Sequence, residues 1–205
     1  RAIAGNALPE PPRMLGDIVT ARIAWAYAIV SAGLFAGAAI VASRRGPAAF
    51  ARSTGLDHFD VDGLWLPGAA VAALYLAVGL YTRAVEAGGI DVLLPAATRL
   101  DATLRDMPAL VLYGLTTVVA APIGEELFYR GLVFGGLAAW GFVPAAVVSS
   151  ALFALSHMDA GALIPFTVLG LAMAWLYWRS GSLWDAIAFH VLFNLLSFIL
   201  LIART

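Results

Sequence analysis

The chain has 205 residues, of which 62% are hydrophobic and 12% are charged, and its net charge is -1. A soluble domain has about 45–50% apolar and about 25% charged residues, so an ordinary soluble domain is excluded. The nearly neutral balance also excludes a strongly basic nucleic-acid-binding face.

Two apolar segments in the first half of the chain predict membrane-spanning helices. The first covers residues 23–42 and is flanked by Arg22, Arg44 and Arg45, and the second covers residues 64–81. Both have about the length of 20 residues that crosses a bilayer core of about 30 Å. The polar stretch between them, residues 46–63, predicts a loop or a short surface helix.

Charged residues return between residues 82 and 108, where the apolar patch at 92–95 is too short to cross a membrane. We predict a linker here, with an amphipathic helix at the membrane interface. The linker divides the chain into an N-terminal region with two transmembrane helices, residues 1–107, and a C-terminal helical core, residues 108–205.

Four further apolar segments follow the linker and complete the predicted fold. They cover residues 109–141, 142–158, 160–178 and 183–203. The predicted fold class is therefore all-α, a polytopic membrane helical bundle with about six transmembrane helices. We expect an integral protein of a bacterial cell membrane, with the lipid bilayer as a partner and no nucleic acid.

Three charged residues, Glu125, Glu126 and Arg130, lie inside the apolar segment 109–141. If all three were ionised and unpaired at a helix centre, they would cost roughly 8–10 kcal/mol. Glu126 and Arg130 are four residues apart with the glutamate first, a spacing that predicts an ion pair. Glu125 points about 100° away and is free to face a cavity. The alternative is that the cluster only joins helices.

Two histidines also lie in or at the end of apolar segments. His157 ends the fourth segment, and His190 lies in the sixth segment with Asn194 one turn later on the same face. Taken singly, each histidine is more typical of a hydrogen bond between helices. Together with Glu125, these side chains indicate a reaction centre.

Hydrolysis suits this set of residues. Glu125 could take a proton from water that His157 orients or polarises, while His190 and Asn194 stabilise an oxyanion. The chain has no cysteine, so no thiol nucleophile exists in it. The candidate hydroxyl nucleophiles are Ser149, Ser150 and Ser156. They are a weaker alternative, because none lies in a Gly-x-Ser-x-Gly turn and because small hydroxyl residues in membrane helices usually serve in packing between helices. The His-Glu-x-x-His zinc signature is absent.

The order of these motifs resembles a known protein family. Glu125-Glu126-x-x-x-Arg130, Phe153-x-x-x-His157 and His190-x-x-x-Asn194 are similar to the three-motif signature of the CPBP family. This family comprises type II CAAX prenyl endopeptidases and bacteriocin-processing membrane proteases, also called Abi proteins. The resemblance covers residues 108–203, and the first half of the chain shows no motif.

The resemblance implies an intramembrane endopeptidase that cleaves a membrane-embedded or membrane-anchored peptide. Glu125 and His157 would activate water, and His190 with Asn194 would form the oxyanion site. Glu126 and Arg130 would hold these residues in position without contacting the substrate themselves. Two alternatives stay open, namely a non-catalytic immunity or scaffold protein and a small transporter that relays protons through Glu125 and the histidines.

The family resemblance leaves the cofactor open between none and a divalent metal such as zinc. Members are commonly called metalloproteases, and a metal-free glutamate mechanism has also been argued for them. Glu125, His157 and His190 could supply three ligands with one position open, as catalytic zinc requires. We favour the metal-free version because these residues are scattered over three helices.

The predicted boundaries contain one geometric conflict. Glu125 lies in the middle of its segment and His157 at the end of its own, yet catalytic partners must lie at one depth. We therefore expect either a shifted third helix with a kink at Pro122 or a fourth helix that ends inside the bundle.

Overall fold

The computed structural model describes residues 11–95 and 106–203, and this part of the chain contains helices and no β-strand. The predicted all-α bundle is therefore confirmed. Its simple helices are α1 (Pro11–Ala42), α2 (Pro47–Ser53), α3 (Trp65–Ala87), α7 (Phe142–Ser156), α8 (Leu163–Ser180) and α9 (Leu183–Ala203). Short 3-10 turns η1 (Asp62–Leu64) and η2 (Asp91–Leu93) flank α3.

One long helical unit over residues 107–140 contains the charged motif, and we call it the 107–140 helix. Its segments are α4 (Met107–Gly114), η4 (Leu115–Ala120), α5 (Ala121–Glu126), η5 (Leu127–Phe134), α6 (Gly135–Leu137) and η6 (Ala138–Trp140). The η4 and η5 segments are π-helical, and they lie on either side of α5. Because π-helical turns are often found at functional sites, their position directs attention to the residues of α5.

All six apolar segments form helices near the predicted positions. Among the described residues, four stretches are long and apolar enough to cross a membrane: Arg22–Val41, Asp62–Ala87, Met107–Trp140 and Leu183–Ala203. Helix α7 has 15 residues and is shorter than the bilayer core, so the six predicted spans become four long ones and two shorter helices, α7 and α8. The amphipathic helix expected in the linker falls partly on residues 96–105, which lie outside the described residues.

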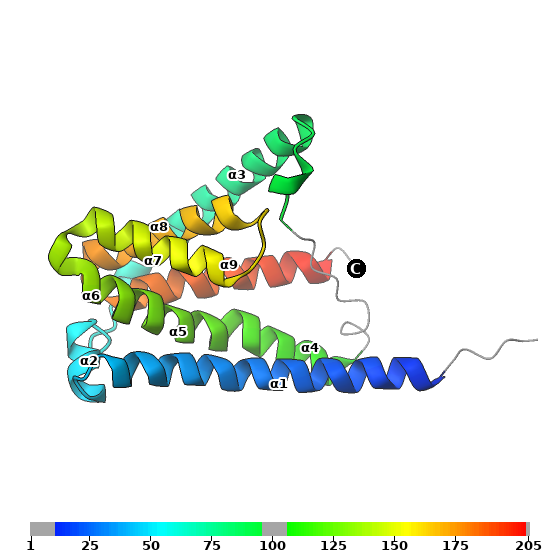
Figure 1. Ribbon diagram of the computed structural model, residues 1–205, viewed down its shortest axis with the longest axis horizontal. Coiled ribbons are helices and arrows are strands. Elements are labelled where there is room, and N and C mark those ends of the chain that lie inside the picture. Colours follow the sequence, from blue (N-terminus) through cyan, green and yellow to red (C-terminus); the bar gives the residue numbers. More distant parts are fainter. Residues whose placement is uncertain (1–10, 96–105, 204–205) are drawn as a thin grey trace, which may run out of the picture.

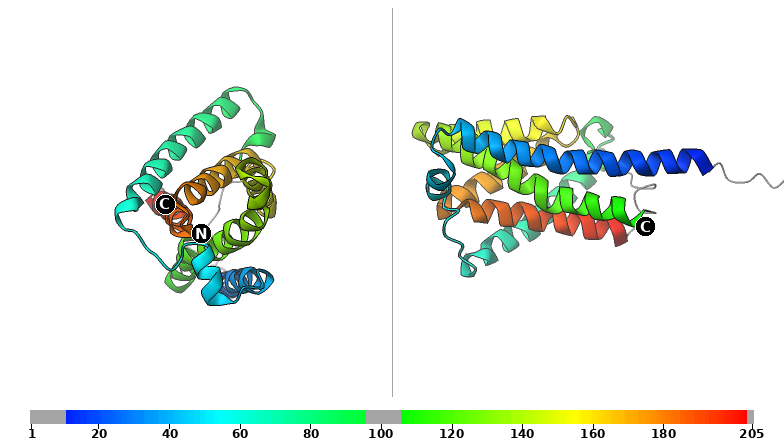
Figure 2. Two further views of the ribbon diagram at one scale, coloured as in Figure 1. Left: turned by 90° about the vertical axis from the view of Figure 1, so that its left-hand side faces the viewer. Right: turned by 90° about the horizontal axis from the view of Figure 1, so that it is seen from below.

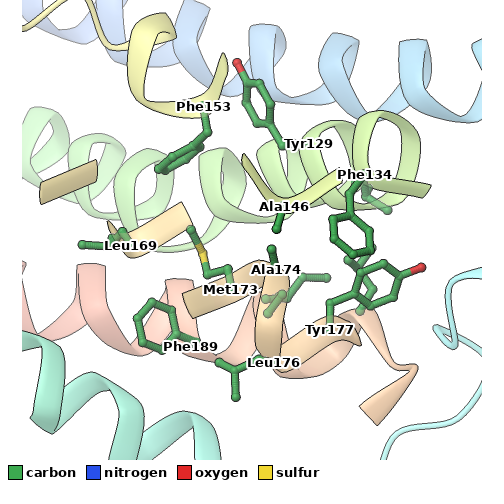
Figure 3. Packing of buried hydrophobic residues seen from close by; sticks show 14 of the residues in the cluster. Tyr129, Phe134, Ala146, Phe153, Leu169, Met173, Ala174, Leu176, Tyr177 and Phe189 are labelled. Atoms are coloured by element: carbon green, nitrogen blue, oxygen red, sulfur yellow. The ribbon is translucent and has the colours of Figure 1, made fainter. Parts of the chain in front are cut away.

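The C-terminal helices form the middle of the bundle, and the two N-terminal helices lie on opposite sides of it. In Figures 1 and 2, α1 runs along the 107–140 helix, while α3 crosses the far side beside α8 and α9. The apolar core lies between the 107–140 helix, α7, α8 and α9, where Met173, Leu176 and Phe189 are fully buried (Figure 3). Large apolar side chains such as Tyr27, Leu34 and Trp65 are exposed on the outside, as lipid contact requires.

Helix α1 packs closely against the 107–140 helix at Gly124. A Cβ atom at this position would lie 2.5 Å from the backbone oxygen of Ala32. We expect Gly124→Ala to lower the free energy of unfolding by about 1–3 kcal/mol, because the two backbones would have to separate. Gly136→Ala is the matched control, since a Cβ there has no neighbour within 4 Å. Unfolding in detergent measures both, and equal stabilities of the two variants would contradict the close packing.

Asp106 begins the 107–140 helix and ties it to α1. Its carboxylate accepts hydrogen bonds from Arg22 Nε at 2.7 Å, from Arg22 Nη2, and from the Ala109 N–H at 3.0 Å. The bonds from the Arg22 guanidinium hold the pKa of Asp106 below its usual range, and the Ala109 N–H lowers it further against the opposing effect of burial. The stabilisation is therefore complete at neutral pH and is lost as the pH falls through that lowered pKa.

Candidate active site

Glu126 and Arg130 form the ion pair that their spacing predicts, and both side chains are fully buried. Arg130 Nη1 donates to Glu126 Oε1 at 2.9 Å, and Arg130 Nη2 donates to the Gly170 carbonyl of α8 at 3.1 Å. The Arg130 guanidinium also lies over the Phe153 ring of α7, 4.7 Å from its centroid. One buried cation thus connects the 107–140 helix with both short helices.

His190 of α9 is the third member of this buried cluster. Its Nδ1 lies 2.9 Å from Glu126 Oε1, and because the carboxylate accepts, Nδ1 carries the proton of this hydrogen bond. The other ring nitrogen, Nε2, lies 3.9 Å from Glu125 Oε2. Glu126 therefore orients His190 so that Nε2 faces Glu125.

Glu125 faces open space, as the helical geometry predicts. Its side chain is 25% exposed, whereas that of Glu126 is fully buried. Glu125 lines two cavities. The larger, of about 680 Å³, is bordered by α3, α7, α8, α9 and the 107–140 helix, and the smaller, of about 360 Å³, lies between α1, the 107–140 helix and the end of α7.

His157 lies directly after the last residue of α7 and lines both cavities together with Glu125. Its Nδ1 lies 2.8 Å from the Phe153 carbonyl oxygen, which can only accept a hydrogen bond, so Nδ1 carries a proton. In the neutral ring, Nε2 can then accept a hydrogen bond or a proton from a reactant. Helix α7 ends here because Met158 has a left-handed backbone and Asp159 accepts from the N–H of Gly161. Helix α7, the fourth predicted span, therefore ends inside the bundle at the level of Glu125. Glu125 and His157 thus lie at one depth, as catalytic partners must.

Asn194 completes the group of predicted residues. Its Nδ2 donates to the backbone carbonyl of Thr117 at 2.7 Å, across the space between α9 and η4. Glu125, His157, His190 and Asn194 all line the larger cavity, so the structure brings the four together. A carboxylate, two imidazoles and a carboxamide in one cavity suit general acid–base chemistry and oxyanion stabilisation.

Two contributors had no role assigned to them from the sequence, although one of them, Phe153, belongs to the second motif. The Phe153 ring packs edge-on against His157 and His190, with centroids 4.8 and 5.6 Å apart, and Figure 3 shows it between α7 and the core. The Thr117 carbonyl that holds Asn194 is the other. The four-residue spacing from Phe153 to His157 was a signal for the first, and a backbone carbonyl leaves no signal in sequence.

The serines occupy two different environments. Ser149 and Ser150 are fully buried in α7 and line neither cavity, which fits packing. Ser156 lines the smaller cavity near Glu125 and donates its hydroxyl to the Phe153 carbonyl at 2.7 Å.

The sequence left zinc binding by Glu125, His157 and His190 as an alternative, and the structure shows whether these side chains converge. Within residues 11–95 and 106–203, no three side chains of His, Asp or Glu converge closely enough to hold a metal ion. The donor types suit zinc, but Glu125, His157 and His190 do not form such a three-ligand cluster in the described part of the chain.

Two comparisons with known proteins found matches to this chain. Residues 107–196 match the family model described as type II CAAX prenyl endopeptidase Rce1-like. The Bacillus subtilis (strain 168) protein named "Putative membrane peptidase YdiL" is 29% identical over 143 residues, which cover 67% of this chain and 56% of that protein. The chain thus spans about half the length of that relative. No solved structure matches.

Proposed function

We propose that this integral membrane protein is an endopeptidase of the CPBP family that uses Glu125 to activate water, because residues 107–196 match the family model of type II CAAX prenyl endopeptidases. The observation that carries the proposal is the position of Glu125, which lines two cavities together with His157 and has its Oε2 3.9 Å from His190 Nε2. The neighbouring Glu126 is fully buried in its ion pair and cannot reach a substrate.

In the proposed reaction, a water molecule between Glu125 and His157 attacks the carbonyl carbon of the scissile peptide bond. Glu125 takes the proton from the water as the new carbon–oxygen bond forms, and His157 Nε2 orients the water. When the tetrahedral intermediate collapses, the carbon–nitrogen bond breaks and Glu125 returns the proton to the leaving amine. The products are a new carboxyl terminus and a new amino terminus.

The developing oxyanion needs hydrogen-bond donors, and two groups at the cavity could supply them. One N–H of the Asn194 carboxamide is held by the Thr117 carbonyl, which fixes the amide so that its second N–H is available. His190 Nδ1 already donates to Glu126, so His190 stabilises an oxyanion only when Nε2 also carries a proton.

The substrate that we propose is a membrane-embedded or membrane-anchored peptide. The larger cavity is lined mainly by aromatic and aliphatic side chains, among them Tyr75, Phe166, Phe193, Phe198 and Leu201. Such walls favour an uncharged segment next to the scissile bond.

The experiment that tests the function is a comparison of protein termini. Membranes from cells with the parent protein and with Glu125→Gln are analysed by mass spectrometry of N- and C-terminal peptides. We expect paired new termini from one or a few membrane proteins with the parent only. The transporter hypothesis would instead be favoured if the termini were identical in the two samples and if the protein carried out proton-coupled flux in liposomes that Glu125→Gln abolishes.

We further propose that the reaction proceeds without a metal. The misfit of Glu125, His157 and His190 to a three-ligand cluster supports this version. Elemental analysis of the purified protein is expected to give far less than one zinc per chain, and a chelator should leave the cleavage rate unchanged. Stoichiometric zinc that is lost together with activity would overturn the metal-free mechanism.

A further inference from the structure

Asn194 is held by a carbonyl that an uninterrupted helix would not offer. In η4 the backbone follows a π-helical pattern, and the Ala121 N–H donates to the carbonyl of Thr116, five residues earlier. The next hydrogen bond of this pattern would join the nitrogen of residue 122 to the Thr117 carbonyl. Residue 122 is proline and has no N–H, so this bond is missing.

The Thr117 carbonyl is thereby left for a partner from another helix. Asn194 Nδ2 occupies it at 2.7 Å. Without that contact, a carbonyl inside a membrane bundle would lack a donor, at a free-energy cost that native structures avoid. The proline and the asparagine are thus complementary, since one removes a donor and the other supplies it.

We propose that Pro122 is a positioning residue, which fixes the Asn194 carboxamide at the cavity by keeping the Thr117 carbonyl free. The inference rests on the proposed function for its catalytic meaning, because a fixed amide is useful where an oxyanion forms. The contact itself is independent of any reaction. Pro122 also lies three residues before Glu125. The same interruption of the helix therefore lies close to Glu125 as well as to the carbonyl that holds Asn194.

The composition of the chain allows a direct test of the contact by NMR. The chain has two asparagines, Asn6 and Asn194, and no glutamine, so a ¹⁵N-labelled sample contains two side-chain carboxamide groups. The variant Asn194→Asp assigns the signals. In the parent we expect one Asn194 amide proton to be shifted downfield and slow to exchange with solvent.

Pro122→Ala supplies the missing N–H and favours helix, so the variant is expected to fold. Exchange of the bonded Asn194 proton should then become about five- to tenfold faster, the effect of losing one ordinary hydrogen bond. Pro144→Ala is the matched control, because Pro144 lies in the first turn of α7, where an N–H has no partner within the helix. Unchanged Asn194 signals in Pro122→Ala would overturn the proposal.

Cleavage of the substrate identified by its termini gives a second readout. Pro122→Ala should lower kcat by about 10- to 100-fold with little change in KM, whereas the double variant Pro122→Ala/Asn194→Ala should equal Asn194→Ala alone. Additive losses would contradict an action through Asn194. If the protein cleaves nothing, the NMR result still decides the contact, so this failure is distinct from that of the proposed function.

Discussion

Glu125→Gln is expected to lower kcat for peptide cleavage by about 10²–10⁴-fold, because the glutamine cannot take the proton from water. KM should change little, since glutamine has nearly the same size and the side chain remains at the same cavity. Single-turnover cleavage in proteoliposomes, with the substrate identified by its new termini, measures both constants.

Glu86→Gln is the matched control for this prediction. Glu86 lies in the last turn of α3 and is exposed, away from both cavities. This variant should cleave at the parent rate. A Glu125→Gln protein that retains more than about a tenth of the parent kcat would remove Glu125 from the role of base.

Arg130→Met is expected to lower the free energy of unfolding by about 3–5 kcal/mol, because it leaves Glu126 as an uncompensated buried charge. The hydrogen bond to the Gly170 carbonyl and the contact with Phe153 are lost at the same time. Denaturant unfolding in detergent measures the loss. The double variant Glu126→Gln/Arg130→Met should recover part of it, since the unpaired charge is then gone.

Arg179→Met provides the comparison for Arg130. Arg179 is exposed in the last turn of α8, and its guanidinium lies 5.7 Å from the Trp175 ring. The expected loss is at most about 1 kcal/mol, as for other exposed cation–π contacts. If Arg130→Met were no more destabilising than Arg179→Met, the buried pair would not connect the helices as the structure indicates.

The sequence allowed the fold class and the polar core to be predicted because both depend on strong local signals. Apolar segments of membrane length identify helices, and charges inside them must find partners. The spacing of Glu126 and Arg130 predicted their ion pair, and the direction of Glu125, about 100° away around the helix, predicted its access to a cavity. Both follow from the periodicity of one helix, without knowledge of its neighbours.

Features that depend on contacts between helices could not be predicted in this way. The hydrogen bond from His190 to Glu126 joins residues 64 positions apart, and the bond from Asn194 to Thr117 joins residues 77 positions apart. The π-helical turns around α5 depend on packing as well as on Pro122. The length of α7 was also overestimated, because the left-handed turn at Met158 has no glycine or proline to indicate it.

Cleavage in H₂¹⁸O by the purified protein tests the central claim most directly, that water activated at Glu125 hydrolyses a peptide bond. Mass spectrometry of a single turnover should find one ¹⁸O atom in the new carboxyl terminus with the parent protein and no product with Glu125→Gln. Equal cleavage by Glu125→Gln, or a covalent acyl adduct on the parent protein, would contradict the account.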